Sequence, residues 1–82
     1  MLDRIIDDNL SKIIVETIYK EHGFKVVKLS LTWQEGFVER SNNRFQRFQV
    51  AETINILKRK NILVRESFGN YMLNRELLIN FK

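Results

Sequence analysis

The chain has no cysteine, and with only 82 residues it cannot rely on a large core for its stability. A domain of this size buries only about 60% of the surface that its unfolded chain exposes, so its stability is marginal. Disulfides or thiolate-bound zinc often support such small domains, and neither is possible here. Packing must therefore hold the fold together, and we expect one domain over residues 1–82. Hydrophobic residues make up 44% of the chain, which is enough for a globular core.

The basic charge is concentrated in one part of the sequence. The formal net charge is +4, yet residues 1–24 carry five acidic and three basic side chains, a net charge of −2. Residues 40–65 carry seven Lys and Arg against Glu52 alone, a net charge of +6. Clustered Lys and Arg are typical of a nucleic-acid-binding surface. The alternative is an ordinary solvated surface that keeps the protein in solution.

The first segment, Leu2 to His22, has the apolar spacing of a helix, and Gly23 supplies a left-handed stop. Val15 and Tyr19 widen the apolar arc, which predicts that this helix packs against more than one neighbour. We expect one neighbour to be a second subunit, in a homodimer formed through this helix and the apolar C-terminal segment, residues 74–82. The main apolar stripe is Ile5, Ile6, Leu10, Ile13, Ile14 and Ile18.

Residues 24–40 are predicted to form a strand followed by a short helix. Apolar and polar side chains alternate over Phe24–Leu31, which places Val27, Leu29 and Leu31 on one face of a strand. Thr32 is then the expected N-cap of a helix from Trp33 to about Arg40. The buried side of that helix is predicted to carry Trp33, Phe37 and Val38.

A long hairpin over residues 24–48 is the alternative for this region. Its strands would be Phe24–Trp33 and Phe37–Phe48, joined by a turn at residues 34–36, and Gly36 suits a turn better than a helix. The fold would then contain a larger sheet, and an Arg- and Phe-rich strand would point to single-stranded nucleic-acid binding.

The remaining elements are a second long helix and a hairpin. After the polar turn Ser41–Asn43, the spacing of Val50, Ala51, Ile54 and Leu57 predicts a helix over Gln46–Lys60. Phe45 and Phe48 are expected to pack rather than to face solvent. Asn61 is a plausible left-handed residue after the helix. Two short strands then follow, at Ile62–Val64 and Tyr71–Leu73, on either side of a glycine-containing loop.

The predicted order is helix, strand, helix, helix and β-hairpin, with a short C-terminal segment, in an α+β and mostly helical fold. This order, and the stretch from Ile54 to Glu66 in particular, resembles the winged helix-turn-helix superfamily. Leu57 matches the family's core leucine, Lys58–Lys60 its charged residues and Ile62–Val64 the first wing strand. Asn61 stands where the family usually has glycine. The resemblance covers about residues 24–73 and is best over residues 46–73.

The resemblance implies a sequence-specific protein that binds double-stranded DNA, acting as a transcriptional regulator. The second long helix would enter the major groove, where Arg, Gln and Asn recognise bases. Arginines of the preceding turn and the wing residues would contact phosphates or the minor groove. The expected contact residues are Arg40, Arg44, Arg47, Gln49, Asn55, Lys58, Arg65, Ser67 and Asn70. Glu52 is the one outward residue that opposes phosphate binding.

A protein-interaction module or an inhibitor that docks on a larger host machine is the alternative function. It would be favoured if Phe45, Phe48 and Ile56 made the exposed face of the second long helix apolar. An enzyme is not expected, because His22 is the only histidine and no glycine-rich phosphate loop is present. We accordingly expect no catalytic residue, no metal site and no cofactor.

The sequence also gives expectations about location and source. No signal peptide and no apolar stretch of membrane-spanning length is visible, so a cytoplasmic protein is expected. The abundance of Ile, Asn and Lys is typical of AT-rich genomes, which include those of many phages and archaeal viruses. A viral or plasmid regulator acting in the host cytoplasm is consistent with that bias.

Overall fold

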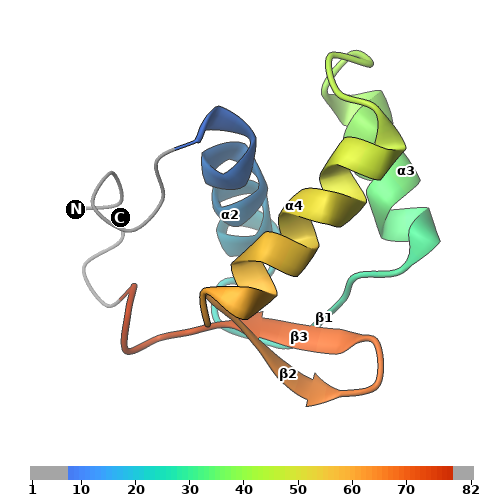
Figure 1. Cartoon of the computed structure of the whole chain (residues 1–82). Coiled ribbons are helices and arrows are strands. Elements are labelled where there is room, and N and C mark those ends of the chain that lie inside the picture. The colour runs from blue at the N-terminus through green and yellow to red at the C-terminus, as the bar shows by residue number, and fades with distance from the viewer. Residues whose placement is uncertain (1–7, 79–82) are drawn as a thin grey trace.

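A computed structural model describes residues 8–78, which form an α+β fold (Figure 1). It has helices α2 (Asn9–His22), α3 (Leu31–Arg40) and α4 (Arg47–Arg59) and strands β1 (Val27–Lys28), β2 (Leu63–Ser67) and β3 (Asn70–Leu73). The order of elements along the chain is α2, β1, α3, α4, β2 and β3, as predicted.

The three strands form one antiparallel sheet in the order β1-β3-β2. Strands β2 and β3 are the predicted hairpin, in which Leu63 lies opposite Leu73 and Arg65 opposite Tyr71. Strand β1 pairs with the other edge of β3, with Val27 opposite Tyr71. A bulge between Arg65 and Ser67 adds one residue to β2, and bulges sharpen the local twist of a hairpin.

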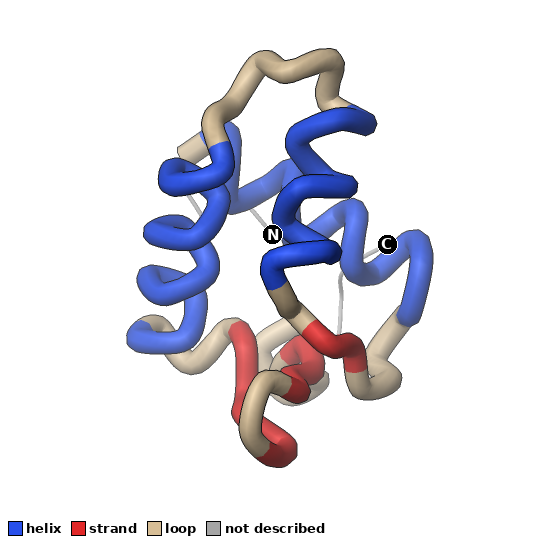
Figure 2. Tube along the Cα trace, turned by 90° about the vertical axis from the view of Figure 1, so that its right-hand side faces the viewer, coloured by secondary structure: helices blue, strands red, loops and turns tan. Residues whose placement is uncertain are grey.

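The arrangement of the helices places α4 at the surface. Helices α3 and α4 lie side by side, joined by a loop over residues 41–46, and the hairpin projects beyond the opposite end of this pair (Figure 2). All three helices lie on one side of the sheet (Figure 1). The loop and the hairpin therefore mark the two ends of α4.

The core draws side chains from every helix and strand of the described chain. Phe37 of α3 is buried in the core, and Leu78 reaches the core from the segment after β3. The predicted inner face of α4 is confirmed for Val50, Ile54 and Leu57, while Ala51 lies half-buried at its edge. The buried apolar residues are Ile14, Val15, Ile18, Val27, Leu29, Phe37, Val50, Ile54, Leu57, Ile62, Leu63, Leu73 and Leu78.

The predicted continuous helix from Leu2 is wrong at Asp8. Asp8 has the extended backbone of an N-cap, with φ −102° and ψ 150°, and its carboxylate accepts a hydrogen bond from the Ser11 amide at 3.1 Å. An Asp side chain that satisfies a first-turn amide favours a helix start over helix continuation. Residues 2–7 of that prediction lie outside the described part of the chain. Gly23 has the predicted positive φ, 63°.

Two predictions for residues 24–40 also need correction. Strand β1 is only two residues long, and Leu31 is 59% exposed instead of facing inward, because it begins helix α3. Ser30 rather than Thr32 is the N-cap, since the Ser30 hydroxyl accepts a hydrogen bond from the Trp33 amide at 3.3 Å. The long hairpin over residues 24–48 is wrong, because residues 31–40 are helical. The single-stranded nucleic-acid binding that depended on this hairpin therefore has no structural basis.

The backbone conformation at both ends of α4 follows from the residues that stand there. The preceding turn, which was predicted over Ser41–Asn43, has positive φ at Asn42 and Asn43. After the helix, Asn61 has φ 65°, its amide bonds to the Lys58 carbonyl and the Ile62 amide bonds to the Leu57 carbonyl, each at 3.0 Å. This pair of bonds is a Schellman motif, so the prediction for Asn61 is confirmed.

Candidate nucleic-acid interface

The outer side of α4 is a stripe of four exposed residues. Phe48, Glu52, Asn55 and Arg59 follow spacings of four, three and four, which keeps them within about 60° of one another around the helix. Val50 and Leu57 on the opposite side are fully buried, so packing fixes which side faces out. The helix has 13 residues and is therefore about 20 Å long.

Two arginines lie at the loop end of α4. Arg47 is the first residue of the helix and is exposed, and Arg44 is exposed in the loop before it. The Arg44 guanidinium lies 5.3 Å from the ring centroid of Phe45, which is half-buried against the core. Phe45 therefore packs as predicted and gives Arg44 an aromatic support.

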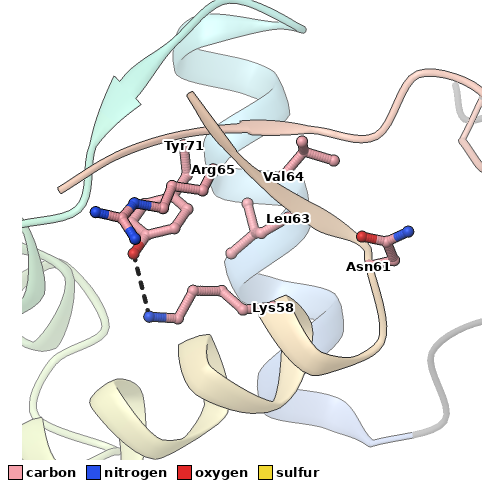
Figure 3. Close-up of a pocket in the computed structure, with 6 residues that line it drawn as sticks. All are labelled: Lys58, Asn61, Leu63, Val64, Arg65 and Tyr71. Atoms are coloured by element: carbon pink, nitrogen blue, oxygen red, sulfur yellow. Dashed lines mark hydrogen bonds between the residues drawn. The ribbon is translucent and has the colours of Figure 1, made fainter. Parts of the chain in front are cut away.

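A second pair of cations lies at the hairpin end. The Lys58 ammonium donates a hydrogen bond to the Tyr71 hydroxyl at 3.2 Å and lies 4.9 Å from the centroid of that ring (Figure 3). Arg65 is the cross-strand neighbour of Tyr71, and its side chain points to the same side as that of Lys58. A pocket of about 380 Å³ opens here, lined by Lys58, Asn61, Leu63, Val64, Arg65 and Tyr71. Two cations and a phenol hydroxyl at one pocket suit an anionic oxygen group.

The hairpin tip carries the most exposed aromatic ring among the described residues. Phe68 is 88% exposed, and the Arg65 guanidinium lies 5.8 Å from its ring centroid. The Asn70 amide nitrogen donates to the Ser67 hydroxyl at 2.9 Å, so these two predicted contact residues also hold the tip in shape.

Arg40 and Gln49 are predicted contact residues whose side chains make other contacts within the protein. Arg40 forms an ion pair with Glu21 of α2, donates to the Gly36 carbonyl at 3.2 Å and lies over the Trp33 ring. It therefore faces α2 rather than the outer side of α4. The side-chain oxygen Oε1 of Gln49 accepts a hydrogen bond from the Gln46 backbone amide at 2.8 Å, so Gln49 takes part in the cap of α4.

The structure thus gathers Arg44, Arg47, Asn55, Lys58 and Arg65 around the outer side of α4 and the hairpin. Glu52 is the only acidic residue of the outer stripe. The cations at both ends of α4 outnumber it, so the interface is basic overall.

Sequence reasoning missed three residues of this surface. Phe48 is 61% exposed, contrary to the expectation that it packs, and Phe68 and Arg59 were not proposed as contacts. The spacing of Arg59 from Asn55 was visible in the sequence. An apolar residue inside an otherwise polar turn was the available signal for Phe68.

Within residues 8–78, no group of three or more His, Cys, Asp or Glu side chains is arranged to hold a metal ion. None of the helices in this range is both long and apolar enough to cross a membrane. No family model, curated protein or solved structure matches the chain. Residues 8–78 thus form a small α+β fold of three helices and a three-stranded antiparallel sheet, with a basic surface along α4.

Proposed function

We propose that this protein is a sequence-specific double-stranded DNA-binding protein of the winged helix-turn-helix type that acts as a transcriptional regulator. Helices α3 and α4 would form the helix-turn-helix, and the β2–β3 hairpin would be the wing. The sheet order β1-β3-β2 and the position of the hairpin beside α4 support this reading. Fold resemblance alone does not establish function, so the proposal depends on the surface itself.

The observation that carries the proposal is the exposed outer side of α4 with cations at both of its ends. A helix with its side chains is about 10–12 Å wide and fits the major groove, which is about 12 Å across. With α4 in that groove, Arg44 and Arg47 would approach one phosphate strand, and Lys58 and Arg65 the other. The two pairs lie about 20 Å apart along the axis of α4, so each pair would reach a different strand with the helix crossing the groove at an angle.

The outer stripe offers base-reading groups between these phosphate contacts. Asn55 can form two hydrogen bonds to adenine, and Arg59 can do the same with guanine. Glu52 lies between Phe48 and Asn55, where a carboxylate can accept a hydrogen bond from cytosine. A stripe that mixes an amide, a carboxylate and a guanidinium is suited to selecting a sequence rather than only binding phosphate.

The experiment that tests the proposal is selection of random duplex DNA on the purified full-length chain. Enrichment of a defined sequence, with an affinity that falls steeply as salt rises, is the expected result. A chain that enriches no duplex, or one whose complex is insensitive to salt, would contradict it.

A protein-docking module is the second candidate, and the exposed rings of Phe48 and Phe68 favour it. Exposed apolar groups mark partner surfaces when they form one patch. On this surface, however, cations lie beside the aromatic rings, at Arg44–Phe45, Lys58–Tyr71 and Arg65–Phe68. Alternating cations and rings suit phosphates and bases better than an apolar protein partner.

The proposed homodimer has less support than the DNA surface. Ile14, Val15 and Ile18 of α2 are buried by the protein's own core, so the broad apolar arc needs no second subunit. Leu77 is 41% exposed and remains available for such a contact. Enrichment of a palindromic site and a doubled mass in solution would support a dimer.

A further inference from the structure

We propose that Phe68, at the tip of the hairpin, is a wedge that inserts between base pairs from the minor groove and bends the bound duplex. This inference rests on the proposed function and deepens it, because it assigns a mode of DNA deformation to one residue. Apolar side chains that enter the minor groove unstack a base step and kink the duplex toward the major groove.

The first support is the exposure of this ring. Phe68 is 88% exposed, whereas Phe37 in the core is 2% exposed, so Phe68 adds almost nothing to the stability of the fold. Phe68 lies in the turn between β2 and β3, and this hairpin projects beyond the helices (Figure 2). A ring in that position can reach between two bases before any other apolar group of the hairpin touches the duplex.

The second support is the rigidity of the turn that carries Phe68. Gly69 adopts φ 78°, and its carbonyl accepts a hydrogen bond from the Leu29 amide at 3.1 Å, which ties the tip to the segment after β1. Asn70 donates to the Ser67 hydroxyl across the turn, and to the Phe68 carbonyl at 3.4 Å. A tip held by three such bonds loses little conformational freedom on binding, so more of the stacking energy is available for the complex.

The third support is the charge around the ring. The Arg65 guanidinium lies 5.8 Å from the ring centroid, on the strand that leads to the tip. Phe68 also lines a groove of about 850 Å³ together with Lys28, Ser30 and Asn70. A strand of DNA that gives up a base step to Phe68 would find the cations of Arg65 and Lys28 near the ring for its phosphates.

The geometry of the proposed complex also directs Phe68 to the minor groove. With α4 in the major groove, the hairpin beside it lies over the flanking phosphate strand, and the minor groove is the next feature of the duplex. That groove is about 6 Å wide, which admits one flat ring more readily than a whole hairpin. Phe68 is the residue of the tip whose side chain is both apolar and flat enough to enter that groove.

The test uses the full-length chain and its selected duplex, labelled at both ends for energy transfer and carrying 2-aminopurine at successive positions. The wild type should shorten the end-to-end distance and raise the 2-aminopurine signal at one step. Phe68→Ala should abolish both signals and weaken binding by about tenfold, which is within the range for loss of one stacked base. Phe68→Leu keeps an apolar wedge and should retain most of the bend.

Val26→Ala is the matched control, because it removes an exposed apolar side chain before β1 rather than at the hairpin tip, and it should leave the bend unchanged. If Phe68→Ala binds and bends the duplex as the wild type does, the wedge is overturned while the DNA-binding function stands. If the wild type binds no duplex at all, the proposed function fails, and the wedge fails with it.

Discussion

The Lys58 ammonium donates a hydrogen bond to the hydroxyl of Tyr71 at 3.2 Å and lies 4.9 Å from the centroid of the same ring. The contact joins the last turn of α4 to the middle of β3. It holds a cation beside Arg65, at the pocket between the helix and the hairpin. The protein therefore presents two positive charges at this end of α4 before any ligand is bound, and their contribution can be measured separately from that of the tyrosine.

We predict that Lys58→Ala weakens binding to all duplexes alike and lowers the slope of log affinity against log salt by about one, because one phosphate contact is lost. Tyr71→Phe keeps the ring beneath the ammonium and should change the affinity by less than about twofold. The measurement is fluorescence anisotropy over a salt series. Arg75→Ala is the charge-matched control, since Arg75 lies over Phe24, and it should leave the slope nearly unchanged.

A second prediction compares two arginines that sequence reasoning treated alike. Arg47→Ala should weaken binding to the selected duplex by about tenfold, because the exposed guanidinium at the start of α4 lies beside the groove-facing stripe. Arg40→Ala removes the same charge, but that guanidinium is paired with Glu21 on the α2 side. It should change affinity by less than about threefold. Equal losses from both variants would mean that only overall charge matters.

A third prediction concerns the left-handed residue after α4. Asn61→Ala should lower the free energy of unfolding by about 1 kcal/mol, because a Cβ without a polar side chain disfavours φ 65°. Asn61→Gly should be at least as stable as the wild type, since glycine adopts this conformation freely. Urea denaturation of the two variants measures the difference. Equal stabilities for the alanine and glycine variants would contradict the prediction.

A fourth prediction uses the pH dependence of the α2 cap. Burial raises the pKa of the Asp8 carboxyl, but hydrogen bonds from Ser11 and the positive charge of Lys60 lower it by more, so the pKa lies below 3.8. A carboxyl whose pKa is lowered on folding stabilises the fold fully above its unfolded value, and that contribution is lost as pH falls through the folded value.

Asp8→Ala should therefore cost about 1 kcal/mol at neutral pH, and the difference from the wild type should shrink as pH falls below 3.8. Asp8→Asn keeps an uncharged hydrogen-bond acceptor at the cap and should remain close to the wild type in stability. Thermal unfolding over a pH series gives both comparisons. A cost for the alanine variant that stays constant down to strongly acidic pH would rule out a role for the carboxylate charge.

Several elements could be predicted because their determinants are near neighbours in the chain. The inner face of α4 follows from the spacing of Val50, Ile54 and Leu57, and the hairpin follows from two apolar runs around Gly69. The start of α2 was mispredicted for a local reason as well. The apolar spacing continues across Asp8, so periodicity alone did not reveal that this residue caps a helix.

The candidate site was predicted less well, because exposure depends on distant segments. Phe48 was expected to pack, yet no other element within residues 8–78 covers the outer side of α4, and 61% of the residue stays exposed. Arg40 was expected at the interface, but its partner Glu21 is 19 residues away in the sequence. Helical spacing places Phe48 opposite Val50 and Leu57, but it does not show whether another element covers that side or that Arg40 pairs with Glu21.

The sequence by itself determined the element types, the ends of α4 and the concentration of positive charge in residues 40–65, since periodicity, capping and composition act over a few neighbouring residues. Only the tertiary structure decided which of those charges share one surface. The pairing of β1 with β3 joins Val27 to Tyr71, and it brings the start of α3 beside the hairpin tip. Contacts between residues so far apart depend on how the whole core packs, because each element can bury its apolar face only against the others.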